Sequence, residues 1–138
     1  MPLYHIVLAN NHAPLREGLK RILKENSELK VIGEAGDGLE LLSFLNLSNV
    51  PLHMVILDLS LPNLKRDIIH KIKAIQPDVK VLILSMHKDK EYFGRAIING
   101  AEGYLLKENV DRELLPAVEV IRQGGVYVPS LLSGTLPN

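Results

Sequence analysis

The chain has 138 residues, of which 46% are hydrophobic, and its 16 basic and 16 acidic residues cancel to a formal net charge of zero. This length suffices for one hydrophobic core, and the neutral balance excludes an overall field that would draw the segment itself to nucleic acid or to a membrane surface. Because the chain has no cysteine and its apolar runs are too short to span a membrane, we expect one cytoplasmic domain without disulfides or thiolate metal sites.

Five short runs of apolar and β-branched residues predict strands. They comprise residues 4–9, 30–34, 54–57, 80–84 and 103–106. Several of these runs are apolar without alternation, which is typical of parallel strands that are covered on both faces.

Segments with apolar residues three or four positions apart alternate with the strands and predict helices. They comprise residues 14–25, 39–45, 66–75, 91–100 and 111–123. Repeated βα units predict a parallel sheet between two layers of helices, the doubly wound α/β class. Pro116 falls inside the last helix and predicts a kink or a weakened first turn, and the glycines after Gln123 predict its end. Prolines, serines and a glycine in residues 126–138 indicate a linker or tail.

Polar side chains follow four of the five predicted strands, at the edge of a doubly wound sheet where sites form. Asn10 and Asn11 follow the first strand, Asp58 the third, Ser85 the fourth and Lys107 the fifth. Each has an ordinary structural role open to it, such as helix capping for the acid or a surface position for the lysine. An acid, a hydroxyl and a lysine at three strand ends together favour a shared functional site.

Six blocks of sequence occur in a characteristic order: "LANNHAPLREGL", "VIGEAGDG", "VILDLSLP", "VLILSMH", "NGAEGYLLK" and "AVEVIRQGGVYV". Together, over residues 4–128, they resemble the receiver domain of two-component response regulators of the NarL/FixJ group, whose output is a LuxR-type DNA-binding domain. The resemblance implies a flavodoxin-like (βα)5 fold with strand order 2-1-3-4-5. It places the receiver domain at residues 1–125, followed by a linker or tail at 126–138.

The resemblance also implies a role for individual residues. Asp58 matches the phosphoacceptor, Ser85 the switch hydroxyl that bonds the phosphoryl group, Lys107 its cationic partner and Tyr104 the aromatic residue whose rotamer couples to the switch. The implied partners are a sensor histidine kinase, a helix-turn-helix domain C-terminal to this segment and a second copy in a homodimer. Such a domain is regulatory, and at most catalyses its own phosphorylation.

A magnesium site in this family uses the acceptor aspartate, a backbone carbonyl two residues later and a pair of acids after the first strand. Here the corresponding ligands are Asp58, the Ser60 backbone carbonyl, Asn11 and, through water, Asn10. Asparagine brings no charge to a cation that dehydrates reluctantly, so we expect only weak Mg²⁺ binding. The same replacement removes repulsion around Asp58 and leaves its carboxylate free to pair directly with Lys107.

Two further groups of charged or titratable residues permit a functional and an ordinary interpretation. Lys65 and Arg66 could bring positive charge close to Asp58 and partly replace the metal, or they could form the solvated start of the third helix. His12 and His87 could extend a metal site, but their spacing is not that of a chelate, and surface positions are favoured.

Three functions compete for these residues. A nucleotide or flavin enzyme is disfavoured because "NNHAP" is not a phosphate-binding loop, and "GEAGDG" follows the second strand with two acids and reads as a turn. A working phosphoacceptor is favoured by Asp58, Ser85 and Lys107. A pseudo-receiver that acts as an interaction module without phosphorylation is favoured by the loss of both first-strand acids, and this alternative remains open.

Overall fold

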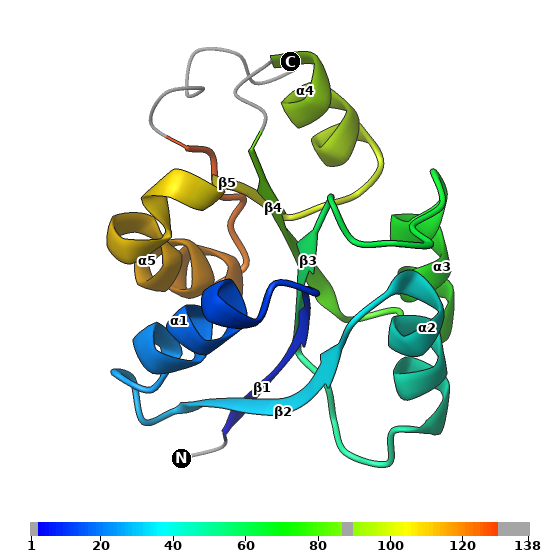
Figure 1. Ribbon diagram of the computed structural model, residues 1–138, viewed down its shortest axis with the longest axis horizontal. Coiled ribbons are helices and arrows are strands. Elements are labelled where there is room, and N and C mark those ends of the chain that lie inside the picture. Colours follow the sequence, from blue (N-terminus) through cyan, green and yellow to red (C-terminus); the bar gives the residue numbers. More distant parts are fainter. Residues whose placement is uncertain (1–2, 87–89, 130–138) are drawn as a thin grey trace.

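The computed structural model describes residues 3–86 and 90–129 as one parallel sheet between two layers of helices (Figure 1). The strands and helices alternate as β1 (Tyr4–Ala9), α1 (Ala13–Leu23), β2 (Leu29–Ala35), α2 (Gly38–Leu47), β3 (Met54–Asp58), α3 (Ile68–Ile75), β4 (Lys80–Ser85), α4 (Lys90–Ile98), β5 (Gly103–Leu106) and α5 (Val110–Arg122). A short 3-10 helix, η1 (Lys107–Asn109), precedes α5. The strand order is β2-β1-β3-β4-β5, which confirms the predicted fold class and order.

Each predicted strand and helix is present, β1 and β5 with the predicted bounds and the others with bounds that differ by at most two residues. The largest departure at a helix start is in α3, which begins at Ile68 and not at residue 66. The backbone N–H of Ile68 donates to the carbonyl of Lys65, so residues 65–68 form a turn before the helix. Charges at 65–67 therefore belong to the connection and not to the helix itself.

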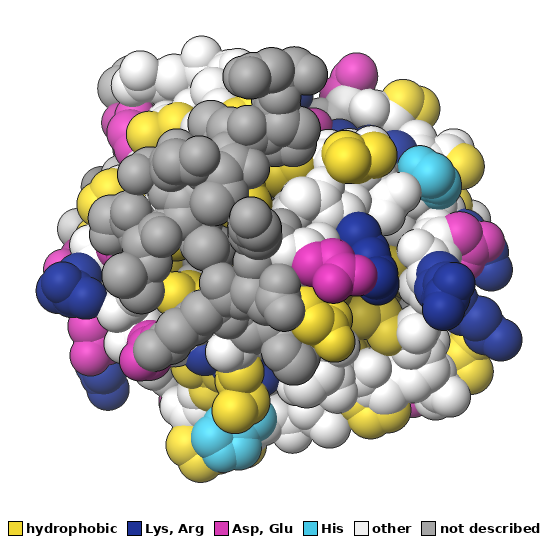
Figure 2. All heavy atoms as spheres, turned by 90° about the horizontal axis from the view of Figure 1, so that it is seen from above, with side chains coloured by type: hydrophobic (Ala, Val, Ile, Leu, Met, Phe, Trp, Pro, Cys, Tyr) yellow, Lys and Arg dark blue, Asp and Glu magenta, His cyan; other side chains and the backbone are white. Residues whose placement is uncertain are grey.

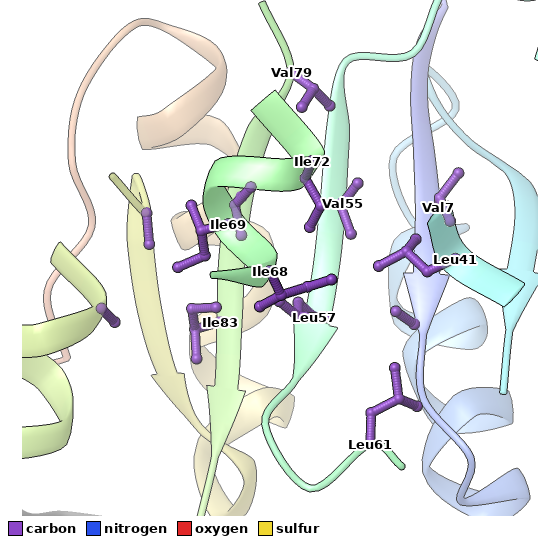
Figure 3. Packing of buried hydrophobic residues seen from close by; sticks show 14 of the residues in the cluster. Val7, Leu41, Val55, Leu57, Leu61, Ile68, Ile69, Ile72, Val79 and Ile83 are labelled. Atoms are coloured by element: carbon purple, nitrogen blue, oxygen red, sulfur yellow. The ribbon is translucent and has the colours of Figure 1, made fainter. Parts of the chain in front are cut away.

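Two hydrophobic clusters fill the spaces between the sheet and its helices. On one face α2, α3 and α4 pack against the sheet, and on the other face α1 and α5 do so (Figure 1). Figure 3 shows the first cluster, in which Ile68, Ile69 and Ile72 of α3 face the sheet around Leu57 and Ile83. Burial of each such side chain contributes roughly 1.5–3 kcal/mol.

The central strand β3 fixes the position of the candidate site. All five of its residues are buried, and it pairs with β1 on one side and β4 on the other. Its apolar residues are covered on both faces, as the absence of alternation predicts. Asp58, the last residue of the strand, is therefore held at the carboxyl edge of the sheet with no solvent exposure.

The connection after β3 packs against the start of α2. Asp37 caps this helix by accepting from the Glu40 N–H at 2.7 Å, and the Glu40 side chain accepts from Gly36 N–H at 2.8 Å. Gly38 donates its N–H to the Pro62 carbonyl at 2.9 Å, and a Cβ atom at Gly38 would lie 2.3 Å from the Asn63 carbonyl oxygen. Only glycine permits this approach. The turn predicted for "GEAGDG" is confirmed only at Gly36 and Asp37, because residues 33–35 belong to β2 and Gly38 begins α2.

The C-terminal end of the described chain returns to the sheet. Helix α5 runs through exposed Pro116 and ends at Arg122, and Gly124 follows with φ of 95°, as predicted for the end of this helix. Tyr127 then forms a parallel bridge with Gly103 of the edge strand β5. Ordered contacts thus continue past residue 125, and the boundary predicted there between receiver and linker stays a prediction.

Candidate functional site

Four polar residues meet at the carboxyl edge of the sheet. Asn10 directly follows β1, Asp58 and Ser85 end β3 and β4, and Lys107 begins η1 directly after β5. Asn10, Asp58 and Ser85 are buried. Asp58, Ser85 and Lys107 line one pocket of about 80 Å³, together with Leu59, Ser60 and Met86. The structure therefore brings the predicted acid, hydroxyl and lysine into one site.

The Asp58 carboxylate accepts four hydrogen bonds. Its Oδ2 accepts from Asn10 Nδ2 at 2.7 Å and from Lys107 Nζ at 2.8 Å. Its Oδ1 accepts from the Ser60 backbone N–H at 2.9 Å and from the Ser60 hydroxyl at 2.8 Å. An ionised carboxylate offers about four lone-pair positions, so every one is used. This arrangement offsets the desolvation of a fully buried charge.

Lys107 supplies the positive charge of the site. Its ammonium forms an ion pair with Asp58 and donates a second hydrogen bond to the Ser60 hydroxyl at 3.1 Å. The lysine side chain is 18% exposed, whereas the Asp58 side chain is fully buried. Asp58 and Lys107 are thus directly paired, whereas the part that the asparagines play in this pairing stays a prediction.

Asn10 turns its amide so that the donor faces Asp58. Its Oδ1 accepts from the His12 backbone N–H at 2.6 Å, which leaves Nδ2 to donate to the carboxylate. The opposite orientation would place an oxygen against the carboxylate and an NH₂ group against a backbone N–H, so the hydrogen-bond partners fix the assignment. Asn10 therefore acts toward Asp58 as a hydrogen-bond donor.

The other residues expected at the site lie farther from the carboxylate or in the core. Asn11 is exposed to solvent. Tyr104 is fully buried on β5, and its ring meets that of Phe93 edge-on, with centroids 5.6 Å apart. Tyr104 thus lies between the sheet and α4, where a change of rotamer would disturb the packing of that helix.

The residues around Asp58 do not fit a magnesium ion in this arrangement. All four lone-pair positions of the carboxylate accept hydrogen bonds, and the Asn10 side-chain oxygen is turned to His12. Within residues 3–86 and 90–129 no group of three His, Asp or Glu side chains could hold a metal. A cation would have to displace Asn10 or Lys107 from Oδ2, or Ser60 from Oδ1, before it could bind Asp58.

The remaining charged candidates fall elsewhere. Lys65 and Arg66 are exposed and line a separate groove between α3 and α4, not the Asp58 pocket. The hypothesis that they replace the metal beside Asp58 is therefore not supported; the two side chains are solvated, as the ordinary interpretation expected, but they lie in the connection before α3 and not in the helix. His12 is exposed, as expected for a surface residue, and His87 lies outside the described residues.

Sequence reasoning missed two contributions to the site. It assigned Ser60 only a backbone carbonyl, whereas both its N–H and its hydroxyl donate to Asp58. An aspartate that bonds the N–H two residues later is a known turn pattern, so "DLS" carried a usable signal. Arg16 Nη1 donates to the Asn10 carbonyl at 2.8 Å and holds the β1–α1 connection, a contact that no local motif indicates.

Comparison with known proteins assigns the family. Residues 6–119 match the family described as "Response regulator receiver domain". The chain is 34% identical over 135 residues to the oxygen regulatory protein NreC of Staphylococcus carnosus, covering 96% of this chain and 61% of that protein. It is 37% identical over 128 residues to the transcriptional regulatory protein DegU of Brevibacillus brevis, covering 89% of this chain and 52% of that protein. The chain thus spans less than two thirds of these relatives.

Solved structures give the same result. A LuxR-family two-component response regulator from Aurantimonas sp. SI85-9A1 superposes with a TM-score of 0.87 at 25% identity, covering 97% of this chain and 95% of that one. The Salmonella typhimurium response regulator RcsB superposes with a TM-score of 0.88 at 25% identity, covering 99% of this chain and 68% of that one.

Family membership carries general properties. Receiver domains are regulatory and not enzymes, act with histidine kinases in two-component systems and generally bind Mg²⁺ at the phosphorylation site. In the part of this chain that the structure describes, no helix has the length and apolar character needed to cross a membrane. The fold, the match over residues 6–119 and the relatives together show that this chain belongs to the response regulator receiver domain family, with LuxR-type regulators among its homologues.

Proposed function

We propose that this chain is the phosphoacceptor domain of a LuxR-type transcription regulator, and that Asp58 accepts a phosphoryl group from a sensor histidine kinase with weakened dependence on Mg²⁺. The observation that carries the proposal is the pocket of about 80 Å³ at Asp58, with Lys107 and Ser85 on its walls. This volume is several times what one water molecule needs. The match to receiver domains over residues 6–119 supports the same assignment.

In the proposed reaction a carboxylate oxygen of Asp58 attacks phosphorus. The bond from phosphorus to the donor's nitrogen breaks, and an acyl phosphate forms on Asp58. Transfer of this kind depends on positioning and on stabilising the charge on the phosphoryl oxygens. The Lys107 ammonium, 2.8 Å from Oδ2, and the Asn10 amide, 2.7 Å from it, are placed to do so once the reacting oxygen is released.

Weak metal binding is part of the proposal. We infer that Asn10 and Asn11 stand at the positions where the family has its acidic pair, so that the ligand set Asp58, Asn11, the Ser60 carbonyl and water-bridged Asn10 lacks charge. Magnesium binding must also break the hydrogen bonds that now saturate Asp58. Millimolar Mg²⁺ should therefore change the thermal midpoint little, because a ligand stabilises only as far as it is bound.

The switch is proposed to run through Ser85 and Tyr104. Ser85 lines the pocket; its hydroxyl would bond the new phosphoryl oxygens, and Tyr104 would shift with it. A population shift of this kind requires contacts that differ between the two states. Ser85→Ala should therefore weaken the change in partner affinity or dimerisation more than it weakens phosphorylation.

The remaining parts of the proposal concern the whole protein. Residues 1–125 form the receiver and 126–138 lead toward a helix-turn-helix output domain, since the relatives are longer than this chain. RcsB dimers bind DNA in one of the structures that this chain resembles, so a homodimer is proposed here too. DNA binding is assigned to the output domain, and a cytoplasmic location follows from that target.

A pseudo-receiver is the second candidate, and one observation favours it. Four donors already saturate the Asp58 carboxylate, so the unmodified site is stable without a metal or phosphate. In that case the domain would serve as a protein interaction module, and Asp58 would be structural.

Intact mass after incubation with acetyl phosphate decides between the two. We expect an added phosphoryl group on the wild type in Mg²⁺, a similar yield in EDTA, and none on Asp58→Asn. Loss of the adduct in EDTA alone would contradict the weakened metal dependence. Absence of the adduct in both buffers, and with a phosphorylated histidine kinase as donor, would decide for the pseudo-receiver.

A further inference from the structure

A groove of about 460 Å³ lies between α3 and α4, apart from the Asp58 pocket. We define the α3–α4 groove by its lining, which comes from the connection before α3, from α3 itself and from one side of α4. Its volume lies within the range of about 300–1,000 Å³ that is usual for sites that bind small organic molecules.

The floor of the α3–α4 groove is apolar. Ile68 and Ile69 of α3 and Ala96 of α4 line it, and all three belong to the hydrophobic cluster on this face of the sheet. Figure 3 shows Ile68 and Ile69 projecting from α3 onto that face. The floor is therefore built on the rigid core and offers apolar surface to a ligand.

The rim of the groove is positively charged. Lys65, Arg66 and Arg95 line it together with Asn99, and none of the described residues that line it carries a carboxylate. Arg95 pairs with Glu91 one turn away on α4, whereas no ion pair involves Lys65 or Arg66 in the part of the chain that the structure describes. In Figure 2, Lys and Arg side chains, with acidic side chains among them, lie toward the right-hand edge of the view, the side on which α2 and α3 lie in Figure 1.

We propose that the α3–α4 groove binds a small organic anion, a molecule with an aromatic or aliphatic body and a carboxylate, sulfonate or phosphate group. The body packs on Ile69 and Ala96, and the anionic group accepts hydrogen bonds from Lys65 and Arg66. Guanidinium and ammonium groups suit such anions, and burial of the body supplies apolar contact that an inorganic ion lacks. The site would respond to a metabolite as a second input to the domain.

Such a ligand would lie next to the phosphoacceptor. Leu59 lines both the groove and the Asp58 pocket, and it is the residue after Asp58 in sequence. Its N–H donates to the Leu84 carbonyl at 3.0 Å, which ties it to the end of β4 directly before Ser85. A ligand that shifts Leu59 would therefore act on both predicted functional residues.

Fluorescence titration with 8-anilinonaphthalene-1-sulfonate tests the proposal, with the neutral analogue N-phenyl-1-naphthylamine as the matched probe. We expect saturable binding of the sulfonate and weaker binding of the neutral compound. Lys65→Gln/Arg66→Gln, at two exposed positions, should raise the Kd of the sulfonate about 3- to 20-fold, as two partly solvated charge pairs should give. The Kd of the neutral probe should stay within about twofold, since its affinity does not depend on those charges.

A matched control removes the same charge elsewhere. Lys24 and Lys30 are exposed and line a second groove beside α1 and β2, on another part of the surface. Lys24→Gln/Lys30→Gln should leave the Kd of the sulfonate unchanged. An equal effect of both double variants would show that net charge alone attracts the probe, and the proposed site would be wrong.

The location of the probe gives a second readout. Backbone amide shifts in an NMR titration should change mainly at residues 64–69 and 92–99, and changes spread over the surface would contradict the proposal. Binding of an acidic peptide in place of the sulfonate, or a change of oligomeric state in the Lys65→Gln/Arg66→Gln variant, would instead make the groove a protein interface. These measurements use no phosphodonor, so their result is independent of the phosphorylation of Asp58.

Discussion

The two ends of the parallel sheet hold buried polar groups in opposite electrostatic states. At the carboxyl end, Asp58 is fully buried as a charge, with Lys107, Asn10 and Ser60 all donating to it. At the amino end, buried Tyr4 and half-buried His53 are neutral, and their rings stack with centroids 4.9 Å apart.

The amino end keeps its groups neutral through burial. His53 Nδ1 accepts from the His5 backbone N–H at 2.8 Å, so this nitrogen carries no proton. Burial, followed by the nearby His5 and Arg122, lowers the pKa of His53, and burial raises the pKa of Tyr4 to about 12. The Tyr4 hydroxyl is buried without a hydrogen-bond partner among the described residues.

The difference between a buried charge at one end and neutral groups at the other predicts how substitutions at each end affect the protein. A buried charge is tolerated only while its partners remain, because removing one leaves a desolvated ion unpaired. A neutral group that is left unpaired costs less. Changes at the carboxyl end should therefore have large effects and respond to metal and phosphate, whereas changes at the amino end should be small and respond to pH.

The largest expected effect follows from Lys107→Met. This substitution keeps the aliphatic stem but leaves Asp58 without a cation, and it should lower the free energy of unfolding by about 3 kcal/mol. Adding Asp58→Asn removes the buried charge and should recover most of the loss. Urea midpoints of the wild type, the single variant and the double variant measure this. If Lys107→Met leaves the urea midpoint unchanged, Asn10 and Ser60 suffice to hold the charge of Asp58.

Asn10→Asp should have the next largest effect. It replaces the donor at 2.7 Å from Asp58 Oδ2 with a second carboxylate oxygen. The repulsion between two such charges is at most about 4 kcal/mol at about 4 Å with an effective dielectric near 20. Because the structure can relax, we expect the free energy of unfolding in EDTA to fall by only about 1–3 kcal/mol. Asn11→Asp, at an exposed position, should change stability by less than about 0.5 kcal/mol in EDTA.

Magnesium should reverse the sign for the double variant Asn10→Asp/Asn11→Asp. Restored anionic ligands should raise Mg²⁺ affinity roughly 5- to 150-fold, equivalent to about 1–3 kcal/mol. Stability curves of this variant and the wild type should therefore cross between EDTA and saturating Mg²⁺. Equal responses of the two proteins to metal, with equal phosphorylation rates, would place the asparagines outside the metal site.

At the amino end, Tyr4→Phe should stabilise the protein by about 1 kcal/mol, because it removes a buried hydroxyl that has no partner. Tyr127→Phe is the matched control. The Tyr127 hydroxyl donates to Glu113 Oε1 at 2.6 Å, so its removal should destabilise by about 1 kcal/mol. Thermal unfolding of both variants measures the difference, and a loss in Tyr4→Phe would mean that its hydroxyl is satisfied in solution.

The carboxyl end was largely predictable from sequence because periodicity decides where each strand stops. Asp58, Ser85 and Lys107 follow apolar runs, and parallel strands bring their carboxyl ends to one edge. The orientation of the Asn10 amide was not predictable, since it depends on where the His12 N–H lies. A direct pairing of Asp58 with Lys107 could be expected from their opposite charges alone, without knowledge of their side-chain rotamers.

The α3–α4 groove and the amino end were not predictable in the same way. Leu59, Lys65 and Asn99 come together only through packing of α4 beside α3, and no local pattern marks them as neighbours. His5 and His53 lie 48 positions apart, and their contact depends on the register of β1 against β3. Sequence patterns predict which element a residue occupies, whereas contacts between side chains of different elements need the assembled core.

The smallest expected effect is a dependence of stability on pH at the amino end. The folded pKa of His53 lies below its ordinary value of 6.5, so the unfolded chain binds more protons there as the pH falls. The contribution of His53 to the free energy of unfolding is thus complete above pH 6.5 and is lost as the pH falls through the folded pKa. Protonation at Nδ1 would also break the hydrogen bond from His5 N–H.

In His53→Asn a side-chain oxygen can accept the same N–H without titrating, so the fall in urea midpoint below pH 6.5 should become shallower than in the wild type. His70→Asn, at an exposed histidine on α3, should retain the wild-type profile, and equal profiles in all three proteins would assign the pH dependence to other groups.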